Sequence, residues 1–97
     1  MVSYCLTNRA KADLQRIYLY GLENYGEKRA DIYQEDLIKK FEYISQNPLS
    51  YQVVDIIGTH YRRAVCGIDN IYYKVVDGEN IVEIIAIIGK QEVDGIF

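Results

Sequence analysis

Hydrophobic and polar residues follow different periods in different parts of this chain. Residues 2–7 alternate between apolar and polar side chains, which predicts a short, half-buried strand. From residue 8 to residue 46 the apolar positions recur every three or four residues, which predicts two amphipathic helices. From residue 51 the period shortens again and predicts a series of strands. We therefore expect one strand, two helices and then a sheet.

The two predicted helices have clear boundaries. Thr7 can cap the first helix, because its hydroxyl can accept a backbone N–H of the first turn. Gly26 ends this helix by taking the left-handed conformation, and Glu27 places a carboxylate at the positive end of the second helix. Asn47-Pro48 ends the second helix, because the residue before a proline disfavours helix. A link this short makes the helices antiparallel neighbours.

Each predicted helix has one apolar face. On the first helix this face comprises Ala10, Leu14, Ile17 and Gly21, widened by Tyr18 and Leu22. On the second helix it comprises Ala30, Tyr33, Leu37, Phe41 and Ile44. Because each face is a single stripe, we expect the hairpin to bury it against the sheet.

Four strands are expected after the hairpin, at residues 51–57, 61–67, 71–76 and 81–88, with turns at residues 58–60 and 68–70 and at Asp77-Gly78. The last strand is the most apolar, and Glu83 is its only charge, so we expect a central strand covered on one face by the helices. Residues 89–97 form either a short turn of helix or an extended arm. The predicted fold class is α+β: an N-terminal strand and an antiparallel helical hairpin packed on a small, mainly antiparallel sheet.

Composition narrows the class of protein. A chain of 97 residues is expected to form one domain, residues 1–97, because two cores would each be too small. It has no apolar run long enough to span a membrane and no secretory signal, so we expect a cytoplasmic protein without membrane contact. Cys5 and Cys66 lack metal-ligand spacing, so we expect buried free thiols, no metal and no cofactor. A net charge of −3 argues against direct nucleic-acid binding.

Several strings of residues resemble a known family. The string Tyr4-x-Leu6-Thr7-x-x-Ala10-x-x-Asp13-Leu14-x-x-Ile17 is similar to the opening of the ParE toxins of bacterial toxin–antitoxin pairs. The similarity continues in order through Tyr25-Gly26, Ala30, Tyr33, Leu37, Phe41, Ile44, Asn47-Pro48, Gly58, Tyr61-Arg62-Arg63, Ile71-Tyr72-Tyr73-Lys74-Val75 and Val82-Glu83-Ile84-Ile85. The order and spacing of these strings together carry the resemblance.

This resemblance implies a ParE/RelE-type fold and a function. It implies the toxin of a type II toxin–antitoxin system, with plasmid stabilisation as a role and a cognate antitoxin that folds over the toxin and neutralises it. It implies DNA gyrase as the target of a protein inhibitor rather than an enzyme, with DNA contact only through an antitoxin complex. The alternatives are a RelE-like endoribonuclease that cleaves messenger RNA on the ribosome, and an antitoxin-binding homologue with little or no toxicity.

Two adjacent arginines form the first candidate site. Arg62 and Arg63 occupy consecutive positions of a predicted strand, so their side chains point to opposite faces of the sheet. One of them can hold a carboxylate of the antitoxin or of the target through a bidentate contact. The alternative is an exposed arginine paired with a nearby acidic side chain. Lys74 and Lys90 are further candidate cations for partner binding.

The next strand holds the candidates for a ribonuclease. Tyr73 or Lys74 would handle the 2′-hydroxyl proton, and Arg63 would stabilise the phosphorane charge. The interpretation that we favour packs Tyr73 in the core, and the role of Lys74 stays open. The family resemblance implies a histidine where this chain has Asp69, and an arginine followed by Leu-His where it has Ala86, Ile88 and Gly89. These departures argue against a phosphate-binding cleft.

Two further observations complete the candidate residues. His60 is the only histidine, and we expect a solvated turn residue rather than a general base, which needs an orienting partner. The helices carry more tyrosines than their apolar stripes can bury, namely Tyr18, Tyr20, Tyr25, Tyr33 and Tyr43. We expect some of these tyrosines to line an antitoxin groove, and Tyr18 and Tyr33 are the candidates for partner binding. The alternative is that they lie across the rim of a small core.

Overall fold

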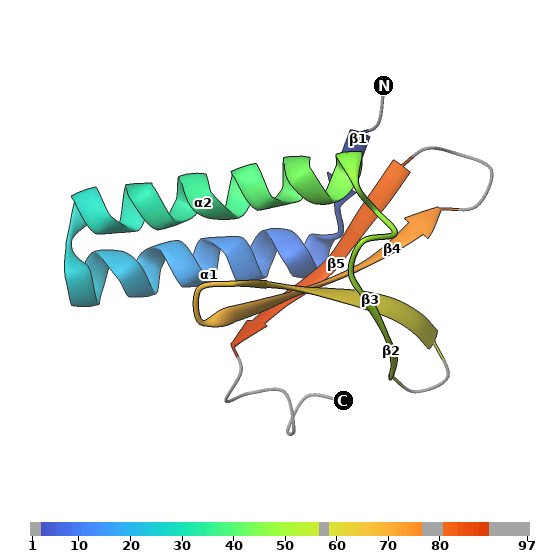
Figure 1. Cartoon of the computed structure of the whole chain (residues 1–97). Coiled ribbons are helices and arrows are strands. Elements are labelled where there is room, and N and C mark those ends of the chain that lie inside the picture. Colours follow the sequence, from blue (N-terminus) through green and yellow to red (C-terminus); the bar gives the residue numbers. More distant parts are fainter. Residues whose placement is uncertain (1–2, 57–58, 77–80, 90–97) are drawn as a thin grey trace.

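The chain folds as a helical hairpin that covers one face of a five-stranded sheet (Figure 1). This computed structural model describes residues 3–56, 59–76 and 81–89. The elements are β1 (Ser3–Leu6), α1 (Asn8–Tyr25), α2 (Glu27–Gln46), β2 (Gln52–Ile56), β3 (Thr59–Cys66), β4 (Asp69–Val76) and β5 (Ile81–Gly89). The predicted α+β class and the order of strand, hairpin and sheet are confirmed.

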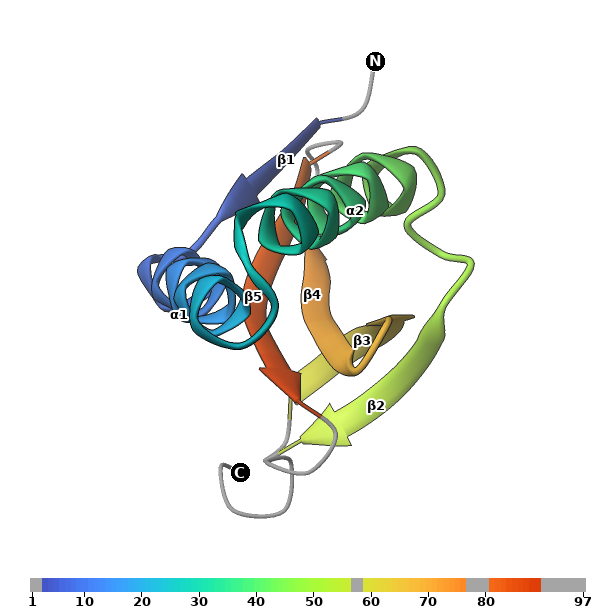
Figure 2. The same cartoon turned by 90° about the vertical axis from the view of Figure 1, so that its left-hand side faces the viewer.

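The sheet has the strand order β1-β5-β4-β3-β2. Only β1 and β5 pair in parallel, and the other neighbours are antiparallel. The apolar strand β5 therefore lies between β1 and β4, as the sequence predicts. The hairpin packs mainly on β1 and β5, and α2 also contacts β3, whereas Figure 2 shows β2 at the far edge of the sheet from α1.

The local helix signals act largely as expected. Thr7 Oγ1 accepts the Ala10 N–H at 3.0 Å, which confirms the N-cap of α1. The second helix runs from Glu27 to Gln46 and ends directly before Asn47-Pro48. Gly26 has a φ of +89° and a ψ of 167°, so the predicted left-handed helical conformation is wrong. The observed backbone region is nevertheless essentially restricted to glycine.

The core lies between the hairpin and the sheet. Both predicted apolar stripes contribute to it, through the fully buried Ala10, Leu37, Phe41 and Ile44. The sheet contributes Ala64, Ile71, Tyr73, Val82, Ile84 and Ile87. A smaller cluster of Tyr72, Ala86 and Ile88 forms apart from this core, with Val54 and Ile85 packed against it.

A register shift between Tyr72 and Tyr73 explains how β5 contributes side chains to both hydrophobic clusters. Ile84 pairs with Tyr73 and Ala86 pairs with Tyr72, so Ile85 is the extra residue of a bulge. Consequently Ile84 and Ile87 both belong to the core beneath the helices, although they are three residues apart. No alternation pattern in the sequence predicts this change of phase.

Beyond the end of β1, Thr7 and two side chains of α1 form hydrogen bonds with the backbone of β5 in place of a neighbouring strand. The parallel pairing of β1 ends with Leu6 opposite Ile84. From there Thr7 Oγ1 donates to Ile85 O at 2.8 Å, and Asp13 Oδ2 accepts the Ile87 N–H at 3.0 Å. Arg16 donates to Ile87 O at 3.2 Å. These bonds satisfy backbone groups that lack a strand partner, and they fix α1 along β5.

Two sequence predictions on the strands are wrong. The turn between β3 and β4 is Gly67-Ile68, and Asp69 and Asn70 belong to β4, where both are 4% exposed. Asp69 can be buried there because the Tyr33 hydroxyl donates to its carboxylate. His60 lies within β3 and not in a turn, opposite Asp55 of β2.

The expected burial of the cysteines is wrong as well. Cys5 and Cys66 are both free thiols, but Cys5 is exposed and Cys66 is only half-buried. The predicted Asp77-Gly78 turn, Gly58, Lys90 and the alternatives for the tail lie outside the described residues. Among the helices that the structure describes, none has the length and apolar character needed to cross a membrane.

Candidate partner-binding groove

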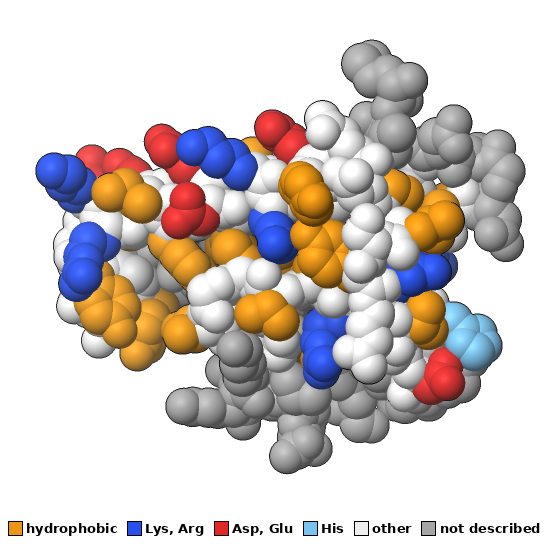
Figure 3. All heavy atoms as spheres, viewed as in Figure 1, with side chains coloured by type: hydrophobic (Ala, Val, Ile, Leu, Met, Phe, Trp, Pro, Cys, Tyr) orange, Lys and Arg blue, Asp and Glu red, His pale blue; other side chains and the backbone are white. Residues whose placement is uncertain are grey.

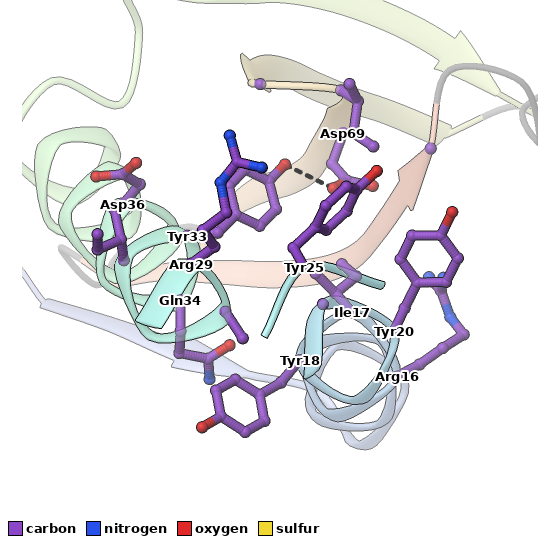
Figure 4. Close-up of a pocket in the computed structure, with 16 residues that line it drawn as sticks. Arg16, Ile17, Tyr18, Tyr20, Tyr25, Arg29, Tyr33, Gln34, Asp36 and Asp69 are labelled. Atoms are coloured by element: carbon purple, nitrogen blue, oxygen red, sulfur yellow. Dashed lines mark hydrogen bonds between the residues drawn. The ribbon is translucent and has the colours of Figure 1, made fainter. Parts of the chain in front are cut away.

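A groove of about 820 Å³ opens where the connected ends of α1 and α2 meet the β3–β4 turn (Figure 4). Its lining includes Tyr18, Tyr20, Tyr25 and Tyr33 from the hairpin, and Ile68 from the turn. The structure therefore brings together four of the five helix tyrosines that the sequence suggested for a groove. The fifth, Tyr43, lies further along α2.

Large apolar side chains are exposed in and around this groove. Tyr20, Tyr25, Ile32 and Ile68 are each half exposed or more, and all four line it. Figure 3 shows hydrophobic side chains on this face of the molecule, at the connected end of the hairpin and along it toward the sheet. A patch of exposed aromatic and aliphatic side chains is typical of a protein-binding surface.

Tyr33 joins the second helix to the sheet at the bottom of the groove. Its hydroxyl donates to Asp69 Oδ2 at 2.6 Å and also lies 2.9 Å from the Cys66 carbonyl oxygen. Burial, followed by the hydrogen bond to Asp69, raises the pKa of Tyr33 well above its usual range, so the hydroxyl stays a donor. Gly67 leaves room for this ring, because a Cβ there would lie 2.8 Å from Tyr33 Cε1.

Tyr18 lines the groove on its other side. The Tyr18 hydroxyl donates to Asp31 Oδ1 at 2.6 Å and links α1 to α2. Figure 4 shows Gln34 beside Tyr18, directed away from Tyr33 and Asp69. Gln34 Oε1 is buried and has no hydrogen-bond partner. At the base of the hairpin the helices approach closely, since a Cβ on Gly21 would lie 3.2 Å from Ala30 Cβ.

Among the residues that the structure describes, three exposed charges and one buried charge line the groove. Arg16 is held by Ile87 O and lies 3.7 Å from Asp13, and the Arg29 guanidinium lies 5.6 Å from the centre of the Tyr25 ring. Asp36 is exposed, whereas Asp69 is only 4% exposed. The groove is therefore apolar in its walls and charged at a few defined points.

A cluster of aromatic and basic residues surrounds Arg62. Arg62 donates to Tyr51 O at 2.6 Å, and the Tyr51 ring makes edge contacts with the rings of Tyr43 and Tyr73. Lys40 Nζ lies 5.2 Å from the centre of the Tyr51 ring. This arrangement fixes the chain before β2 against α2 and β3. Arg62 thus has a structural contact in addition to its predicted role in partner binding.

Arg63 and Lys74 lie on the face of the sheet opposite the helices. Arg63 pairs with Tyr72 across β3 and β4, whereas Arg62 pairs with Tyr73, so the predicted separation of the arginines is confirmed. Lys74 lies 3.5 Å from Glu83 and is about half exposed, whereas Arg63 is partly buried. The predicted partner-binding residues are thus divided between two faces of the molecule.

The candidate ribonuclease residues do not meet at one place. Tyr73 is fully buried on the helix side, where its hydroxyl donates to Pro48 O at 2.7 Å. Burial raises the pKa of Tyr73 to about 12. Arg63 and Lys74 lie on the other face. The interpretation that packs Tyr73 in the core is therefore confirmed.

His60 has a partner that the sequence did not reveal. Its Nδ1 lies 2.6 Å from Asp55 Oδ1, but both side chains are more than two-thirds exposed. Among residues 3–56, 59–76 and 81–89, no three histidine, cysteine or acidic side chains are close enough to hold a metal ion. Sequence reasoning also missed Asp69 and Ile68 as groove residues, because it assigned both to a solvated turn.

Comparison with known proteins agrees with this fold. Residues 4–93 match the family described as the ParE toxin of the type II toxin–antitoxin system parDE. Toxin ParE1 of Caulobacter vibrioides is 33% identical over 75 residues, which is 77% of this chain and 78% of that protein.

Solved structures show the same arrangement of helices and strands. A chain of the chromosomal ParDE toxin–antitoxin system from P. aeruginosa superposes with a TM-score of 0.77 at 22% identity, over 92% of this chain and 96% of its own. A chain of the RelBE2 toxin–antitoxin complex from Mycobacterium tuberculosis gives a TM-score of 0.69 at 14% identity, over 92% and 98%. With a match over nearly its whole length, this chain belongs to the ParE toxin family of type II toxin–antitoxin systems.

Proposed function

We propose that this chain acts in the cytoplasm as a protein inhibitor of DNA gyrase, and that a cognate antitoxin neutralises it by binding the groove between the hairpin and the β3–β4 turn. Membership of the ParE family supports the choice of gyrase. The exposed aromatic groove supports the antitoxin site, since half-exposed tyrosines give large contact area at low entropy cost.

The observation that carries a binding mechanism over a ribonuclease is the position of Tyr73. A proton-transfer residue must reach its substrate, whereas the Tyr73 hydroxyl is buried and donates to Pro48 O. Arg63 and Lys74, which would supply positive charge, lie across the sheet from it. We assign Arg63 and Lys74 to contact with the target, because they are accessible on a face that the helices leave uncovered.

Induced expression in a bacterial host tests the proposal. We expect filamentation and a DNA-damage response while bulk protein synthesis continues. The purified chain should inhibit ATP-dependent supercoiling of relaxed plasmid by gyrase, and addition of the antitoxin should restore it. Immediate translation arrest with cuts at defined codon positions, mapped by primer extension, would instead establish a ribonuclease. Harmless expression combined with tight antitoxin binding would refute the assignment of gyrase as the target but would leave the proposed antitoxin site standing.

A further inference from the structure

Asp69 differs in its burial from the other charged groove residues that the structure describes. Arg16, Arg29 and Asp36 also line the groove but are exposed, whereas Asp69 is 4% exposed. Figure 4 shows Asp69 directed from β4 toward Tyr33, between the sheet and the hairpin. A carboxylate in such a position has lost most of its hydration, which is costly unless other groups replace the water.

The groups that replace water around Asp69 are few. In the described part of the chain, its carboxylate receives one side-chain hydrogen bond, from the Tyr33 hydroxyl. Within residues 3–56, 59–76 and 81–89, no lysine, arginine or histidine forms an ion pair with it. An ionised carboxylate can accept about four hydrogen bonds, so the bond from Tyr33 leaves room for further donors.

Asp13 shows how this fold satisfies a carboxylate of equal burial. Asp13 is 5% exposed, and it is contacted by Arg9 at 3.0 Å, Arg16 at 3.7 Å and the Ile87 N–H at 3.0 Å. Two cations and a backbone donor thus surround one buried acid, whereas the other has a single neutral donor. Asp69 lies in an open groove with exposed apolar walls. A bound partner can therefore supply the kind of cation that surrounds Asp13 but is not seen beside Asp69 among the described residues.

We propose that Asp69 is the specificity-determining residue of the groove and receives a lysine or arginine side chain from the antitoxin segment bound there. This inference rests on the proposed antitoxin site. The occupant is an amphipathic segment whose apolar face covers Tyr20, Tyr25 and Ile68 and which carries one basic residue opposite Asp69. A segment without that cation would bury the carboxylate still further from water and leave it unpaired, so the groove selects against such a segment.

The test uses the full chain and the tagged product of the reading frame that adjoins its gene. Asp69→Asn removes the charge but keeps an oxygen that can accept the Tyr33 hydrogen bond. We expect it to weaken binding about 10- to 100-fold in titration calorimetry, the loss typical of a charged hydrogen bond. Asp55→Asn, which makes the same change of charge at an exposed position outside the groove, should leave the affinity within about twofold.

Variants of the antitoxin keep the test independent of the fold of the toxin. Each lysine and arginine in the C-terminal half of the antitoxin is changed to glutamine in turn. One of these changes should reproduce the loss seen with Asp69→Asn, and the two changes together should cost little more than either alone.

The outcomes separate this inference from the proposed function. Wild-type affinity of Asp69→Asn, or the lack of any basic residue of the antitoxin coupled to Asp69, would each overturn the role of Asp69 while antitoxin binding stands. No binding of the unmodified chain to the antitoxin would instead overturn the proposed antitoxin site itself.

Discussion

The Asp13 carboxylate on α1 accepts the backbone N–H of Ile87 on β5 at 3.0 Å, beyond the point at which β1 ends. This bond continues the pairing of the sheet edge with a side chain in place of a strand. Arg9 and Arg16 hold the carboxylate in position from the same helix. The hairpin is therefore attached to the central strand by polar contacts as well as by the core.

Asp13→Ala should destabilise the protein by about 2 to 4 kcal/mol, because it leaves the buried Ile87 N–H without a partner and removes the anion between two arginines. Urea denaturation followed by circular dichroism measures this loss. Glu35→Ala, at an exposed position of α2, is the matched control and should change the free energy of unfolding by less than about 0.5 kcal/mol. Equal effects of the two changes would contradict the role assigned to Asp13.

Gly67→Ala should cost about 2 to 3 kcal/mol. The residue has a φ of +57°, and the added Cβ would lie 2.8 Å from Tyr33 Cε1 and displace the Tyr33 hydroxyl from Asp69. The same change in a Tyr33→Ser background should cost only the backbone contribution, about 1 to 2 kcal/mol. Thermal denaturation of the unmodified protein, the two single variants and the double variant checks this difference. If the costs of the two single changes simply add in the double variant, the clash is ruled out.

The stability of the protein should fall at alkaline pH, and Tyr73 should account for part of the fall. Burial raises the pKa of Tyr73 to about 12, from an ordinary value of 10.0. The unfolded chain therefore loses this proton first, so the contribution is complete below pH 10 and is lost as the pH rises toward 12, by at most about 1.4 kcal/mol per pH unit.

Tyr73→Phe should reveal that contribution. At pH 8 it should cost about 1 kcal/mol, because the hydrogen bond to Pro48 O is lost. At pH 11 the difference from the unmodified protein should shrink or reverse, since phenylalanine does not titrate. Denaturation curves at pH 8, 10 and 11 measure this, and a constant difference across the range would be evidence against a raised pKa.

Arg62 and Arg63 should respond differently to the same substitution. Arg62→Gln loses the bond to Tyr51 O and should destabilise the protein by about 1 kcal/mol. Arg63→Gln should leave the free energy of unfolding within about 0.5 kcal/mol but reduce toxicity and gyrase inhibition, because we assign Arg63 to target contact. Denaturation and growth after induction are compared for both variants. Full toxicity of Arg63→Gln would remove that residue from the contact surface.

Ile68→Asp should separate the two proposed surfaces. The side chain of Ile68 is 69% exposed at the β3–β4 turn, so the change should barely affect folding. It should weaken antitoxin binding at least about tenfold, because an apolar groove wall becomes charged. Inhibition of gyrase by the purified variant should stay unchanged. A parallel loss of both activities would show that antitoxin and target share one surface.

The accuracy of the sequence prediction depends on how local each signal is. The helix ends at Thr7, Gly26 and Asn47 were predictable because capping and the effect of proline involve residues a few positions apart. Asp69 was misassigned to a turn because its burial depends on Tyr33, which is 36 positions away in the sequence. His60 was misassigned for the same reason, since its partner Asp55 lies on the neighbouring strand.

The candidate site was predictable only in part. The excess of tyrosines on the helices indicated a groove, and the alternation of strand residues separated Arg62 from Arg63 correctly. The groove also requires Gly67 and Ile68, which approach the hairpin only after β3 and β4 have paired. The bulge at Ile85 was not predictable from alternation, because it follows from how β5 meets both β4 and α1.

The internal position of β5 has a consequence for when the protein can fold during translation. Both β1 and β4 pair with this strand, which follows them in the sequence. Until the ribosome has released residues 81–89, a nascent chain has two open strand edges and an uncovered hairpin face, so it cannot complete the five-stranded sheet. The surfaces that we propose for antitoxin and target can therefore form only after β5 has been made.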